Sequence, residues 1–152
     1  MPSKMRINYM SEALKEARKA ARRGEVPVGA TLVATNGSII ASDGNRTREM
    51  NDPTAHAEIL VIRKGCYING TERLNGCDLY VSLEPCTMCA AAISFVRIRR
   101  LYFGASDLKM GGVENGSRFF HQTTCHHIPE VYGGIQERQS RHLIKSFFLT
   151  RR

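Results

Sequence analysis

The chain contains no run of about 18 apolar residues, which a transmembrane helix would require. Its N-terminus has no apolar segment of the kind found in secretory signal peptides. We find no internal repeat, no low-complexity tract and no linker within its 152 residues. These absences predict a single domain over residues 1–152, with no membrane association and a cytoplasmic location.

Acidic residues are scarce relative to basic ones. The 14 Asp and Glu residues stand against 22 Lys and Arg residues, giving a net charge of +8 and a pI near 9.6. A basic surface attracts polyanions over long distances, so the charge favours a nucleic acid partner. The five cysteines are an odd number in a chain without an export signal, and disulfides are rare in reducing compartments. We therefore expect free or metal-bound thiols.

The hydrophobic pattern predicts alternating strands and helices. Apolar residues at steps of three and four, from Ile7 to Ala21, indicate a helix over about residues 5–23. Asn36-Gly37 between two apolar runs predicts a hairpin of strands near 27–35 and 38–43. Further strands are expected at 78–83, 100–105 and within 127–134, and further helices from Pro53 or Thr54, over 85–96 and from 136 onward. This order predicts an α/β fold with helices on both faces of one sheet and with parallel later strands.

Cys86 and Cys89 lie three residues apart in the segment EPCTMCAAA, at the expected start of a helix. This spacing places both sulfurs on one face, and a helix N-terminus favours the thiolate form. Metal binding and redox chemistry both need thiolates, so the pair alone does not distinguish them. Two thiolates also leave a tetrahedral zinc site incomplete.

The segment TAHAEIL contains groups that would complete the site. His56 and Glu58 also lie in an expected first helical turn, which we predict to be capped by Asp52. If the two helix starts face each other, His56, Cys86 and Cys89 supply three zinc ligands and leave one position for water. Glu58 is then available to move the proton of that water. H-x-E followed by P-C-x-x-C is the signature of zinc nucleobase deaminases.

A second cluster, at residues 125–127, reads Cys-His-His and offers an alternative. Together with Cys86 and Cys89 it could build a closed structural zinc site. We disfavour this reading because it leaves the histidine and glutamate of TAHAEIL without a role. The other two cysteines, Cys66 and Cys77, are expected in or just below the core.

The chain also resembles the bacterial tRNA-specific adenosine deaminases of the cytidine deaminase-like superfamily, essentially from end to end. The resemblance is carried by EVPVGATLV (25–33), GNR (44–46), DPTAHAEI (52–59), LYVSLEPCTMCAAAI (79–93), RIRRLYFGASDLK (97–109) and SFFLTRR (146–152), while GGVENGSRFF (111–120) is similar to alphaproteobacterial members. It implies a three-layer α/β/α sandwich with a mixed five-stranded sheet. It also implies a homodimer.

The resemblance further implies the roles of individual residues. It implies one Zn2+ per subunit on His56, Cys86 and Cys89, with Glu58 as proton shuttle. The implied substrate contacts are Asn45 to the target base, Val28 lining the pocket, Asp107 and Lys109 to flanking nucleotides, and Phe148 to RNA from the terminal helix. Asn45 and Asp107 also fit turn positions, and Phe148 at helical spacing is more often a core residue than an RNA contact. Leu149 departs from the family, which usually has a basic residue there, although Arg151 and Arg152 are near.

The implied reaction is hydrolytic deamination of adenosine to inosine at wobble position 34, in the anticodon stem-loop of a tRNA. Zinc-bound hydroxide attacks C6 of adenine, Glu58 protonates N1, and ammonia leaves. Two alternatives are a deaminase of free cytosine, cytidine or guanine, and a zinc-stabilised RNA-binding module without activity. The net charge of +8 favours RNA over a small neutral substrate.

Overall fold

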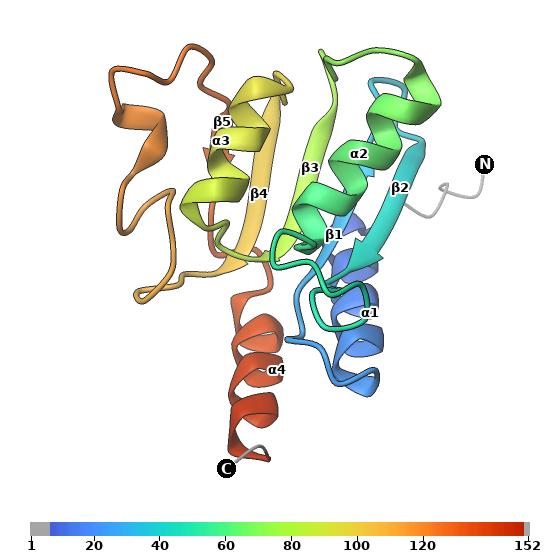
Figure 1. Ribbon diagram of the computed structural model, residues 1–152, viewed down its shortest axis with the longest axis vertical. Helices are drawn as coiled ribbons and strands as arrows, with labels where there is room; N and C mark the ends of the chain where they lie inside the picture. The colour runs from blue at the N-terminus through green and yellow to red at the C-terminus, as the bar shows by residue number, and fades with distance from the viewer. Residues whose placement is uncertain (1–6, 151–152) are drawn as a thin grey trace, which may run out of the picture.

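The fold is that of a computed structural model in which residues 7–150 are described. One sheet holds five strands in the order β2-β1-β3-β4-β5. Helices α2 and α3 lie on one face of the sheet, and α1 and α4 lie on the other (Figure 1). The elements are α1 (Tyr9–Arg22), β1 (Gly29–Val33), β2 (Ile39–Gly44), α2 (Ala57–Asn69), β3 (Asp78–Leu83), α3 (Thr87–Phe95), β4 (Arg100–Ala105), a short 3-10 helix (Phe119–His121), β5 (Glu130–Tyr132) and α4 (Glu137–Leu149). This arrangement confirms the α/β/α sandwich with a mixed five-stranded sheet.

The sheet is mixed, with antiparallel pairs around β1 and parallel pairs from β3 to β5. β1 pairs antiparallel with both β2 and β3, whereas β3–β4 and β4–β5 are parallel pairs. The β1–β2 hairpin turns at Asn36-Gly37, where Gly37 has a φ of +89°, so the predicted hairpin is confirmed. β2 and β3 flank β1 and run in the same direction. Helix α2 makes the crossover that parallel strands need.

Helix α1 is shorter than the predicted helix at 5–23. Asn8 caps it, because its side-chain oxygen accepts the N–H of Ser11 at 3.0 Å. Its buried face packs on the sheet and consists of Met10, Ala13, Leu14, Ala17 and Ala20. Ile7 precedes the cap and is 53% exposed, so its predicted place on the apolar face was wrong. The predicted start at residue 5 lies outside the described residues, as do Arg151 and Arg152.

Helix α2 begins later than predicted, at Ala57 and not at Pro53 or Thr54. Asp52 does not cap it. Its carboxylate instead accepts the N–H of Thr54 at 2.8 Å and the Thr54 hydroxyl at 2.6 Å, which forms a separate turn. The N-cap of α2 is His56, and likewise the N-cap of α3 is Cys86. Both residues thus have extended backbone at a helix N-terminus.

The topology places these two helix starts together. Because β2 and β3 run in the same direction, their carboxyl ends lie at the same edge of the sheet. The chain enters α2 after β2 and enters α3 after β3. The N-termini of α2 and α3 therefore meet at that edge, above the main core cluster that packs between them and the sheet.

Candidate metal centre

His56, Cys86 and Cys89 come together where α2 and α3 begin. Nδ1 of His56 lies 3.7 Å from Sγ of Cys86 and 3.5 Å from Sγ of Cys89. The three donor atoms lie within 4.8 Å of one another, and within residues 7–150 no other trio of His, Cys, Asp or Glu converges in this way. Tetrahedral zinc, with Zn–N and Zn–S bonds of about 2.1 and 2.3 Å, separates its ligands by roughly 3.4–3.8 Å. The donor set therefore fits a zinc ion in both chemistry and spacing.

Hydrogen bonding distributes charge within this cluster. Cys89 donates to the sulfur of Cys86, and this bond, with a smaller contribution from His56, lowers the pKa of the Cys86 thiol to about 4. The same bond and burial raise the pKa of Cys89, and the bond to Cys86 raises the pKa of His56. Of the two thiols, that of Cys86 thus ionises more readily. A bound dication favours deprotonation of the second thiol.

Glu58 lies in the first turn of α2 and is only 4% exposed. Burial raises the pKa of its carboxyl group. Its Oε1 atom is buried and finds no hydrogen-bond partner among the described residues. An unpartnered buried carboxylate oxygen costs free energy, so its presence beside a metal-ligand set indicates that its partner comes from outside the chain. Water and a substrate atom are the fitting partners.

Asn45 connects the end of β2 to the start of α2. Its side-chain oxygen accepts the N–H of Ala57 at 2.8 Å, its own N–H donates to the carbonyl of Val28 at 3.1 Å, and its carbonyl accepts from Arg23 at 3.0 Å. The nitrogen of its side-chain amide, Nδ2, donates to none of the described residues. Asn45 and Val28 are both buried, at 8% and 6% exposure. This capping role was missed from the sequence, and the contact of Asn45 with a base stays a prediction.

The other predicted substrate contacts lie on a loop and on the last helix. The Asp107 carboxylate accepts the N–H groups of Lys109 at 3.1 Å and Met110 at 3.0 Å, so it builds a turn after β4. Lys109 is exposed on that turn. Phe148 is 55% exposed on α4, and its ring packs edge-on against Phe147. For Asp107, Lys109 and Phe148, contact with a nucleic acid stays a prediction.

The cluster at 125–127 does not join the metal-ligand set. The Cys125 thiol lies 3.4 Å from the Ser94 hydroxyl and donates to the His127 carbonyl at 3.2 Å. The His127 ring donates to the carbonyl of Ile98 at 2.7 Å, while His126 is exposed. These contacts tie the segment to α3 and the residues after it. The closed site with Cys86 and Cys89 is therefore not formed.

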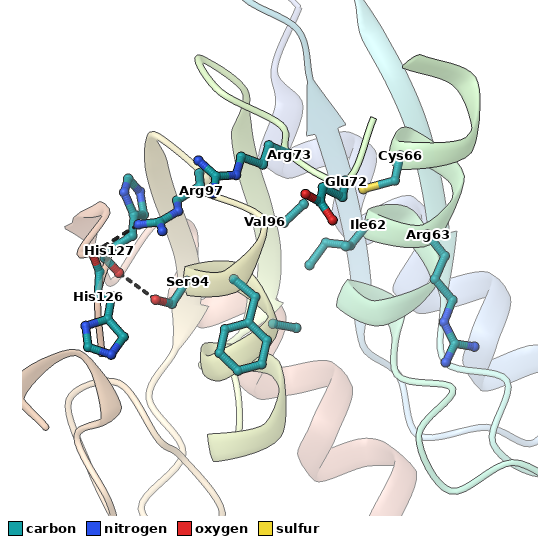
Figure 2. Close-up of a pocket in the computed structure, with 12 residues that line it drawn as sticks. Ile62, Arg63, Cys66, Glu72, Arg73, Ser94, Val96, Arg97, His126 and His127 are labelled. Carbon is teal, nitrogen blue, oxygen red and sulfur yellow. Dashed lines mark hydrogen bonds between the residues drawn. The ribbon is translucent and has the colours of Figure 1, made fainter. Parts of the chain in front are cut away.

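A separate hollow of about 680 Å³ opens between α2 and α3. Figure 2 shows the side chains around it, which come from α2, the segment after α2, α3 with the two residues that follow it, and residues 126–127. Its apolar members include Ile62, Phe95 and Val96. None of the three metal-ligand candidates lines it, so this hollow and the metal centre are distinct features that share the same two helices.

Sequence reasoning also missed Glu84, the residue two positions before Cys86. Its side chain is only 2% exposed, and it accepts hydrogen bonds from residues 107–115. The available signal was an acidic residue at the end of the apolar run DLYVSL, where a buried charge must be paired or hydrogen-bonded.

Comparison with known proteins agrees with this fold and site. Residues 3–105 match the family described as the cytidine and deoxycytidylate deaminase zinc-binding region. The fold and the His-Cys-Cys set thus define a zinc-dependent deaminase. The tRNA-specific adenosine deaminase of Agrobacterium fabrum is 61% identical over 147 residues, which cover 97% of this chain and 96% of that protein. The chain belongs to the tRNA-specific adenosine deaminase family.

Solved structures give the same result. One, from studies of A-to-I editing by tRNA:A34 deaminases at the wobble position of transfer RNA, matches with a TM-score of 0.87 and 64% identity, covering 89% of this chain and 97% of that one. The guanine deaminase of Bacillus subtilis matches less well, with a TM-score of 0.64 and 31% identity over 91% of both chains.

Among the helices of residues 7–150, none combines the length and the apolar character that a membrane span requires.

Proposed function

We propose that this chain deaminates adenosine to inosine at wobble position 34 of tRNA, by zinc-dependent hydrolysis. The observation that carries the proposal is the buried, unpartnered Oε1 of Glu58 beside the His56–Cys86–Cys89 set. A structural zinc site has no use for such a carboxylate, whereas hydrolysis needs a group that moves a proton. The relative that is 61% identical supports tRNA as the substrate.

Zinc bound by His56, Cys86 and Cys89 would lower the pKa of a water molecule to about 7 and so supply a nucleophile at neutral pH. Glu58 accepts one proton of that water and gives it to N1 of adenine. It then takes the second proton from the hydroxyl group now on C6 and gives it to the amine, so that the C6–N bond breaks and ammonia leaves. Burial raises the pKa of Glu58, which helps it to hold the proton between these two transfers. The water-excluding surroundings of Glu58 keep the proton on this route.

The residues around the centre would hold the base. The unused amide nitrogen of Asn45 is available to donate to the adenine ring, and the buried Val28 side chain offers it an apolar wall. A base can reach such a site only when it is flipped out of the stack, and an anticodon loop presents bases in that way. Exposed Lys109 would contact a phosphate, and exposed Phe148 would stack on RNA.

We further propose that the protein acts in the cytoplasm, where its tRNA substrate is found. None of its five cysteines forms a disulfide, which suits a reducing compartment. The net charge of +8 favours the approach of a polyanionic substrate.

The substrate assignment is tested with an anticodon stem-loop that carries adenosine at the wobble position. The zinc-loaded protein is expected to convert that adenosine to inosine, as measured by nucleoside analysis after digestion. The matched control is the same stem-loop with the adenosine moved one position in the 3′ direction, which should stay unmodified. Release of ammonia from free guanine or cytidine, with no inosine in the stem-loop, would instead support the small-substrate alternative.

We also propose that two copies associate through the hollow between α2 and α3. Phe95, which lines it, is 74% exposed, whereas Ile62 and Val96 line it from the buried core, at 9% and 4% exposure. Such exposed apolar area is typical of a protein–protein interface. Phe95→Glu is therefore expected to convert a dimer into a monomer, as measured by light scattering at micromolar concentration.

Leu149→Glu provides the control for this change. Leu149 is similarly exposed, at 67%, but lies at the end of α4 on the other side of the sheet. A wild-type protein that is monomeric, or a Leu149→Glu variant that dissociates equally, would contradict this interface.

A further inference from the structure

Glu84 is a buried carboxylate whose hydrogen-bonding capacity is filled by one loop. Its Oε1 accepts the N–H of Asp107 at 3.0 Å and the side-chain amide of Asn115 at 2.7 Å. Its Oε2 accepts the N–H groups of Val113 at 3.1 Å, Glu114 at 2.9 Å and Asn115 at 3.0 Å. The loop 107–115 thus directs five N–H donors at one buried side chain.

The same loop lies directly against the segment that carries Cys86. The N–H of Gly112 donates to the carbonyl of Pro85 at 2.8 Å, and Cys86 forms an isolated antiparallel bridge with Gly111. A Cβ atom added at Gly112 would lie 2.5 Å from the backbone nitrogen of Thr87, and one at Gly111 would lie 2.5 Å from Oε2 of Glu84. Glycine is therefore required for this close approach. Glu84 lies between the metal-binding segment and the loop that carries Asp107 and Lys109.

We propose that Glu84 is a positioning residue, which holds the loop 107–115 against the metal-binding segment and so orders that loop for RNA before RNA binds. This inference rests on the proposed function, and on the contacts with flanking nucleotides that the family resemblance implies for Asp107 and Lys109. A carboxylate suits the task because it only accepts hydrogen bonds, and the loop presents five N–H donors to it. An ordered loop binds with less loss of conformational entropy.

Glu84→Gln tests the proposal because it keeps the size of the side chain and turns one acceptor into a donor. The amide NH2 group would face N–H groups, so the loop should lose its fixed conformation. The KM for the stem-loop is expected to rise about tenfold, because only a fraction of molecules then holds the competent loop. The kcat should stay within about twofold and the zinc content at one per chain, since the chemical step is not touched.

Two further variants separate positioning from general stability. Asp78→Asn is the matched control, an acid-to-amide change at the other end of β3, where Asp78 pairs with Arg99 at 2.9 and 3.0 Å. It should lower the melting temperature and leave KM unchanged. Asn115→Ala removes a single bond to Glu84 without placing a donor in its site. It should raise KM in the same direction by less, and the two effects should combine less than additively.

Amide hydrogen exchange gives a readout that does not need activity. Faster exchange in Glu84→Gln, confined to residues 107–115 and absent in Asp78→Asn, is the expected result. Unchanged exchange in that loop, a loss of zinc, or a kcat that falls while KM stays constant would each overturn the proposal. If the wild-type protein makes no inosine, the proposed function fails, but the exchange result still decides whether Glu84 holds the loop.

Discussion

Glu58→Gln is expected to lower turnover of the stem-loop substrate by about a thousandfold, with one zinc per chain retained. A side chain acting as general acid and base contributes roughly 10²–10⁴ in rate, and glutamine cannot carry the proton. Glutamine matches glutamate in size, so the packing of α2 is kept. Because Oε1 of Glu58 has no partner among the described residues, the change breaks no hydrogen bond at that atom.

The measurement is single-turnover formation of inosine, alongside zinc analysis and thermal unfolding. The melting temperature of Glu58→Gln should stay close to that of the wild type, because the size of the side chain is kept and no hydrogen bond at Oε1 is lost. Glu12→Gln is the control, since Glu12 lies in the first turn of α1 and only pairs with Lys15 on the surface. Activity of Glu58→Gln within tenfold of the wild type would assign the proton transfer to another group.

Loss of the zinc ion is expected to abolish activity and to lower the melting temperature by about 10 °C, without unfolding the chain. An ion present at about a thousand times its dissociation constant stabilises the folded state by about 4 kcal/mol. In a domain of this size, each kcal/mol shifts the melting temperature by about 2–4 °C. The apo chain should stay folded because its main core, which includes Leu79, Val81 and Phe103 from the strands of the sheet, is buried without any contribution from the metal.

The substitution Cys89→Ser should cause loss of the zinc ion, because Cys89 is a fully buried member of the metal-ligand set. The protein should be purified with less than one zinc per chain and should show the lower melting temperature by circular dichroism. Cys125→Ser is the control, because Cys125 contacts Ser94 and the His127 carbonyl and lies outside the set. A Cys125→Ser variant that loses zinc, or a Cys89→Ser variant that keeps it fully, would contradict the assignment of ligands.

Local patterns predicted the elements well where one face of an element is clearly apolar. The strands expected at 78–83 and 100–105 have these same bounds in β3 and β4. The prediction was wrong at the start of α2, where Asp52-Pro53 has the chemistry of a helix cap. The carboxylate of Asp52 could accept hydrogen bonds either from the first turn of a helix or from Thr54 in a local turn. In the structure it accepts them from Thr54. Periodicity does not distinguish between these uses, because both are local and similar in energy.

The sequence by itself determined the class of chemistry, because the motifs H-x-E and P-C-x-x-C contain both the three zinc ligands and the glutamate that carries the proton. It could not show that these donors meet, since His56 and Cys86 are 30 residues apart. Their meeting depends on β2 and β3 running in the same direction on either side of β1, which places the starts of α2 and α3 at one edge. The roles of Asn45 as a cap and of Glu84 as the acceptor for a loop also depend on contacts between distant segments. Such contacts form only when the whole sheet is assembled, and no local pattern encodes them.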